Sequence, residues 1–177
     1  GMAAVVTHIS AATASLVWMI MDWSKFGKPT LIGLVTGTIA GLASITPASG
    51  SVGPIGALII GASAGFVCYL FVNVVKNKFK IDDSLDVFAV HGVGGLIGIL
   101  LVAFLVDSNF GGAGYADGLN AISQLLIQLK GTFAVLVLSV VASIIITYVV
   151  KYTVGLRVDE SSEVEGLDIS SHGETNS

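Results

Sequence analysis

The sequence has few charged residues, a single cysteine and three prolines. Charged residues make up 11% of the 177 residues and hydrophobic ones 54%, whereas soluble globular domains carry about 25% charged residues. This composition excludes a soluble globular domain. The single cysteine, Cys68, excludes an internal disulfide, and its position in an apolar run favours a packed or lipid-facing thiol over a reactive one.

The sequence also lacks the motifs of enzymes, metal sites and nucleic-acid-binding surfaces. It has no nucleophile and base in a shared motif, no metal-ligand spacing, no phosphate-binding loop and no basic aromatic face. We therefore expect no enzyme activity, no cofactor, no metal and no nucleic-acid partner.

What the sequence does contain is long apolar runs. A hydrocarbon core about 30 Å thick is crossed by a helix of roughly 20 apolar residues. The composition therefore predicts an all-α fold, a polytopic transmembrane helix bundle in contact with the lipid bilayer. The five expected spans cover residues 3–22, 30–46, 53–75, 86–106 and 121–150.

We expect two domains, a membrane bundle over 1–153 and a polar tail over 154–177. The net charge of −4 belongs to the tail, which is rich in acidic residues, so it says nothing about a substrate. Basic residues favour cytoplasmic loops. Seven of the eight fall after the first, third and fifth spans, which predicts a multi-pass protein of the cell (inner) membrane with its tail in the cytoplasm and residue 1 outside. Since no signal peptide precedes that outer end, we expect further chain upstream.

Glycine is abundant, at 22 residues, and lies inside the apolar runs. Small residues four apart let membrane helices approach closely. We expect tight packing through three such ridges. They are Gly33, Gly37 and Gly41; Ala57, Gly61 and Gly65; and Gly94 and Gly98.

Three histidines occur, and only His91 lies well inside an apolar span. Ionisable residues at that depth are costly, normally face the bundle interior, and mark solute or proton pathways. A neutral imidazole offers one donor and one acceptor nitrogen to a small solute. Helical spacing places Val87 and Ser84 on the same face as His91, with Gly94 and Gly95 around the other side. The structural alternative is an imidazole bonded to a neighbouring helix.

Three segments resemble the ammonium transporter (Amt) family: KIDDSLDVFAVHGVGG, GLASITPASGSVGPIGALIIG and the tail GLRVDESSEVEGLDISSHGE. The resemblance covers nearly the whole chain in order. It implies an eleven-span inverted-repeat fold, a homotrimer with a pore in each subunit, and that this chain is spans seven to eleven. By the same resemblance His91 is the second of two pore histidines, Val87 lines the pore wall, and Asp86 is a structural carboxylate. We group Ser84, Gly94 and Gly95 with Asp86 as pore support.

The family's partner histidine, external aromatic site and phenylalanine gate would lie outside these residues, so we expect only the complete protein to transport. The tail resembles a cytoplasmic segment that packs beneath the pores and takes part in regulation by PII signal proteins; disorder is the alternative. The residues of the tail that carry this expectation are Gly155, Glu163, Gly166, Leu167 and Asp168.

The function implied is nitrogen uptake. Ammonium is recruited, and ammonia is conducted, with or without the proton, through a histidine-lined apolar pore. Three alternatives stay open: an ammonium sensor, a proton-coupled permease of another class that uses His91 as a relay, and a purely structural membrane subunit.

Overall fold

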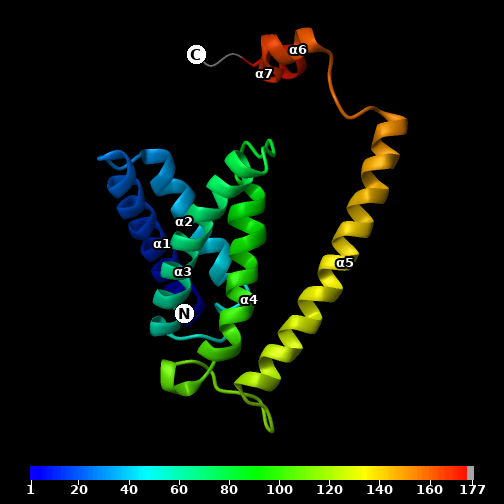
Figure 1. Ribbon diagram of the computed structural model, residues 1–177. Helices are drawn as coiled ribbons and strands as arrows, with labels where there is room; N and C mark the ends of the chain where they lie inside the picture. Colours follow the sequence, from blue (N-terminus) through cyan, green and yellow to red (C-terminus); the bar gives the residue numbers. More distant parts are fainter. Residues whose placement is uncertain (175–177) are drawn as a thin grey trace. The chain divides into compact units, whose positions relative to one another are not determined.

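The computed structural model describes residues 1–174, and every regular element among them is a helix (Figure 1). The expected all-α class is therefore confirmed. The chain forms two compact units, residues 1–132 and the part from residue 133 on, and the division falls inside a helix. The expected domain boundary at residue 153 stays a prediction.

The first unit is a bundle of α1 (Met2–Phe26), α2 (Leu31–Ile45), α3 (Pro54–Asn73) and α4 (Gly94–Leu105). Helix α1 packs against α2 and α3, and α4 packs against the same two helices, as Figure 1 shows. Local signals set the ends: Gly27 closes α1 with a φ of 74°, and Pro54 opens α3 at its first turn.

Two short π-helices extend these elements. Helix η1 (Val74–Lys78) continues α3, and η2 (Phe88–Val93) leads into α4. A 3-10 turn, η3 (Ser108–Phe110), follows α4. The helix α5 covers Ala121–Thr153, and two short helices, α6 (Glu160–Glu165) and α7 (Leu167–His172), come after it.

Four of the helical segments are long and apolar enough to cross a membrane: Met2–Phe26, Pro54–Lys78, Phe88–Leu105 and Ala121–Thr153. Helix α2 is apolar but has only 15 residues, in line with the short second run of the sequence. The helix bounds thus lie within a few residues of the five expected spans; α1, η1 and α5 each end a few residues later than expected, towards the basic loops.

The predicted glycine ridges lie at the closest helix contacts of the bundle. A Cβ on Gly41 or on Gly61 would come within 2.5 Å of the carbonyl oxygen of Ser10 on α1, so only glycine allows these approaches. The buried Ser10 hydroxyl donates to the Gly41 carbonyl at 2.9 Å, which adds a polar tie between α1 and α2. The packing role expected for these ridges is confirmed.

Candidate functional site

His91 lies in the π-helical turn η2, between an irregular loop and the regular helix α4. A π-helix has one more residue per hydrogen-bonded turn than an α-helix, and such turns are frequent at functional sites. The sequence predicted a continuous α-helix here. Compared with a continuous α-helix, the π-turn changes the angle about the helix axis between the side chains before His91 and those after it.

Asp83 fixes the start of this turn. Its carboxylate oxygens accept the backbone N–H groups of Val87 and Phe88, each at 2.9 Å. These are the donors that a helix start leaves without an intrahelical partner. Sequence reasoning missed this residue, because the usual capping signal is an aspartate immediately before the helical run, and Asp86 holds that position here.

Asp86 joins the turn to the end of the preceding helix. Its carboxylate lies 2.8 Å from Lys76 Nζ, and Lys76 belongs to η1. The Asp86 side chain is more enclosed than that of Lys76, with 18% against 39% exposed. The Asp86 backbone adopts φ 55°, a left-handed conformation that is uncommon outside glycine.

Ser84 does not share the helical face of His91. It lies in a turn before the helix begins, and its hydroxyl donates to Asp82 Oδ1 at 3.3 Å. The expectation that helical spacing aligns Ser84 with Val87 and His91 is wrong, because the capping by Asp83 starts the helix only at Val87.

Glycine residues form the face of this segment that packs against the rest of the bundle. Gly94 is buried, and a Cβ there would lie 3.0 Å from Ser44 Oγ and 3.4 Å from Cys68 Sγ. A Cβ on Gly98 would collide with the Ser44 carbonyl oxygen. Gly95, by contrast, faces open space within the described chain. Of the two predicted support glycines, Gly94 therefore packs closely and Gly95 does not.

His91 and Val87 lie on the exposed face of the segment. His91 is exposed, and Val87 and Phe88 are 51% and 60% exposed. The sequence predicts that His91 faces a bundle interior; residues 1–132 do not cover it, and for the complete protein this stays a prediction. Because Gly94 and Gly98 take the contact with α2, the imidazole is left on a face that this chain does not cover.

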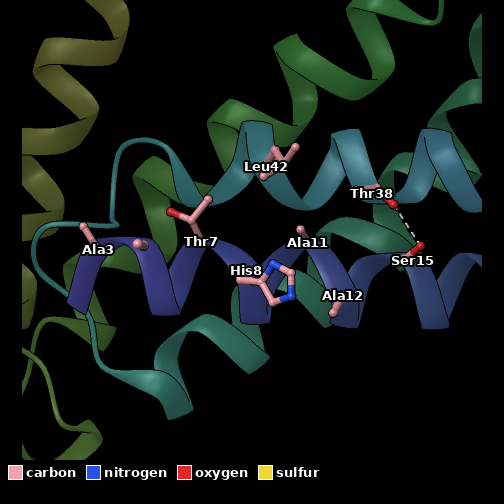
Figure 2. Close-up of a pocket in the computed structure, with 9 residues that line it drawn as sticks. Ala3, Thr7, His8, Ala11, Ala12, Ser15, Thr38 and Leu42 are labelled. Carbon is pink, nitrogen blue, oxygen red and sulfur yellow. Dashed lines mark hydrogen bonds between the residues drawn. The ribbon is translucent and has the colours of Figure 1, made fainter. Parts of the chain in front are cut away.

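His8, the second histidine in an apolar helix, lies in a different place. It lines an open groove of about 600 Å³ on α1 and α2, which Figure 2 shows. Most neighbours in the groove are small, and at one end the Ser15 and Thr38 hydroxyl groups lie 2.9 Å apart (Figure 2). His172 is exposed in α7.

The predicted regulatory residues lie in and around α6 and α7. Gly155 and Gly166 have φ of 85° and 97°, so both are turn positions that favour glycine. Glu163 of α6 pairs with Arg157 at 3.4 Å, and the Ser170 hydroxyl of α7 donates to the Gly166 carbonyl at 3.0 Å. Leu167 and Asp168 open α7. The tail thus has local helical structure as far as His172, and residues 175–177 lie outside the described residues.

Comparisons with known proteins agree with one another. The sequence profile of the Ammonium Transporter Family matches residues 1–177. An ammonium transporter of Aquifex aeolicus is 46% identical over 95% of this chain and 39% of its own length. Ammonium transporter Amt1 of Archaeoglobus fulgidus is 46% identical over 97% of this chain and 43% of its own length. The chain spans about two fifths of the length of these relatives.

Solved structures give the same result. Saccharomyces cerevisiae Mep2 superposes with a TM-score of 0.75 at 33% identity, over 90% of this chain and 41% of Mep2. A structure described as a sensor Amt protein superposes with a TM-score of 0.85 at 29% identity, over 97% of this chain and 42% of its own. With the profile covering its whole length, the chain belongs to the Ammonium Transporter Family.

Proposed function

We propose that this chain is the C-terminal part of an ammonium transporter, and that the exposed face with His91 and Val87 lines its conduction path. One observation carries the proposal: His91, an ionisable residue in an apolar helix, lies on a face that the bundle leaves exposed. The opposite face packs closely through Gly94 and Gly98. Contact between an ionisable side chain and lipid costs free energy. We therefore expect protein or water, and not lipid, beside this face.

The chemistry of the face suits ammonia better than ammonium. The exposed residues of the turn beside His91 are apolar, with Val87 and Phe88 51% and 60% exposed. A bare cation on such a surface would lose its hydration without a counter-charge, at a cost of many kcal/mol. A neutral imidazole can accept from, or donate to, a small neutral solute. Ammonium would thus give up its proton before the apolar stretch.

The rest of the site comes from outside these residues. We propose that a second histidine, an aromatic recruitment site and a gate belong to the part of the relatives' length that this chain does not span. The whole protein would be an eleven-span homotrimer. Its tail, with Gly155 to Asp168, would lie in the cytoplasm with the basic loops and contact a PII signal protein.

A second candidate function is ammonium sensing. The similarity to the sensor Amt protein, over 97% of this chain, favours it. A sensor and a transporter both need an ammonium-binding site, but only a transporter needs a path that crosses the membrane.

Uptake in cells separates these functions. Cells that lack their own ammonium transporters would express the full-length protein with His91 or with His91→Ala, and take up labelled methylammonium. We expect uptake with His91 and a loss of most of it in the variant, at equal amounts of protein in the membrane. Uptake that does not depend on His91 would rule out the pore assignment, and no uptake with either protein would favour a sensor.

A further inference from the structure

A second pocket, of about 230 Å³, lies where α1 ends and α2 begins. This is the end of the bundle that carries the basic loops. Its polar lining includes Asp22 and Lys25 of α1, Thr30 before α2, Thr36 of α2, Tyr69 and Asn73 of α3, and Asp86 before η2. Since Val87 follows Asp86 directly, the pocket adjoins the start of the turn that presents His91.

Asp22 is the buried charge of this pocket. It is 4% exposed, and the Thr30 hydroxyl donates to its Oδ2 at 2.6 Å. Thr30 also accepts the backbone N–H of Gly33 at 2.9 Å, and the missing side chain of Gly33 leaves the space that the carboxylate fills. The local structure therefore holds the carboxylate in one place.

No basic nitrogen neutralises this carboxylate in the part of the chain that the structure describes. Among residues 1–174, the ion pairs with a nitrogen–oxygen distance of at most 4.0 Å are Lys76–Asp86 and Arg157–Glu163, and neither includes Asp22. A carboxylate buried without a counter-cation is costly, and buried charges in proteins are normally paired. Asp22 thus has the charge to hold a cation in a pocket with room for one.

An ammonium group of the chain itself already lies at this pocket. Lys25 Nζ donates to Asn73 Oδ1 at 3.0 Å and lies 5.8 Å from the centroid of the Tyr69 ring. Both contacts are of the kind that bind organic ammonium ions, an oxygen acceptor and an aromatic face. Trp18 packs edge-on against Tyr69, with centroids 5.2 Å apart, and holds that ring in position.

We propose that this pocket is a second binding site for ammonium or a small primary ammonium ion, next to the end of the conduction path. Asp22 supplies the counter-charge, and Asn73 Oδ1 and the Tyr69 ring supply the neutral contacts. Lys25 is a tethered competitor for those neutral contacts. The inference rests on the proposed function, since it takes ammonium, the substrate of the proposed transporter, as the ligand.

Equilibrium binding of radiolabelled methylammonium to the full-length protein in lipid nanodiscs tests the site. In Asp22→Asn, which keeps an oxygen for the Thr30 hydroxyl, we expect one bound methylammonium per chain to be lost, or its affinity to fall at least about tenfold. The matched control is Asp82→Asn, which changes an exposed carboxylate that accepts a hydrogen bond from the Ser84 hydroxyl. It should bind as the wild type does.

Lys25→Met provides a test that does not disturb a buried group. Removal of the tethered ammonium should tighten methylammonium binding, because Asn73 and Tyr69 become free for the ligand. Unchanged or weaker binding in Lys25→Met would overturn the proposal, and so would a folded Asp22→Asn protein that binds as the wild type does. His91→Ala should keep this binding while it loses uptake, so that failure of the second site and failure of the pore assignment give different results.

Discussion

Gly98 makes one of the tightest helix contacts of the bundle, against the carbonyl of Ser44 on α2. Gly98→Ala would force α4 away from α2, and overpacking of this kind costs about 1–3 kcal/mol. We expect a lower Tm for the purified full-length protein in detergent. Gly50→Ala is the control, because a Cβ at Gly50 meets no described atom within 4 Å. Equal Tm values for the two variants would contradict the assigned contact.

Asp159 gives a residue-scale prediction in the tail. The Ser161 hydroxyl, then the backbone N–H and hydroxyl of Ser162, bind its ionised carboxylate and lower the pKa of Asp159 to about 2. The ordinary value for aspartate is about 3.9. Because the pKa is lowered in the folded state, the support that the cap gives to α6 is complete above about pH 4 and is lost as the pH falls through 2.

The check on Asp159 is an NMR titration of its side-chain carboxyl carbon in the full-length protein. A midpoint near 2 agrees with the capped helix start. A midpoint near that of an ordinary aspartate would mean that the hydrogen bonds from Ser161 and Ser162 do not form in solution.

The burial of single residues was the least predictable property. Asp22 is near the end of the first apolar run, where an aspartate normally reaches water, and its burial depends on Thr30 and Gly33 from the next helix. The exposed side of His91 likewise depends on which face of α4 the glycines occupy. A sequence shows that such residues lie in or beside an apolar run. Whether their side chains are buried or exposed depends on how the helices pack against one another.

At the scale of elements, the helices were predictable and the π-turns were not. Long apolar runs closed by proline or glycine gave α1, α2, α3 and α5 to within a few residues. The turns η1 and η2 differ from α-helix by one residue in the hydrogen-bonding pattern, and side-chain periodicity over five or six residues cannot resolve that difference. They lie on either side of the loop that Lys76 and Asp86 tie together.

The cap of η2 can be tested at this scale. Asp83→Ala removes the acceptor of two backbone N–H groups, and losing an N-cap carboxylate costs about 1 kcal/mol of helix stability. We expect faster hydrogen exchange at Val87 and Phe88, which lose their bonds to Asp83. Asp82→Ala, which removes only a contact with Ser84, should leave both rates as they are. Unchanged exchange in Asp83→Ala would show that another group caps the turn.

At the scale of the whole molecule, family membership settles the broad class. The family consists of transporters or channels, so the expectation that the chain is not an enzyme is confirmed, and its apolar helices make it a multi-pass membrane protein. The motif around His91 and the tail were enough to predict the family from sequence. The homotrimer, the PII partner, the membrane orientation and the residue roles stay predictions.

The incomplete site also has an explanation at this scale. The chain covers 39–43% of the length of the two relatives compared. In the transporter that we propose, the face of His91 and Val87, which is exposed in this chain, would be covered by the part of the protein that these residues do not span. The sequence pattern indicated a histidine inside a bundle, and residues 1–132 alone leave it at the surface.

We propose that solute passes along the face of His91. Methylammonium flux into proteoliposomes that contain the purified full-length protein tests this for the wild type, His91→Ala and His8→Ala. We predict that His91→Ala lowers the flux at least about tenfold, which corresponds to about 1.4 kcal/mol in the barrier. His8→Ala, which removes an imidazole that lines a separate groove, should keep the flux of the wild type. Equal flux through the wild type and His91→Ala would show that solute does not pass along this face.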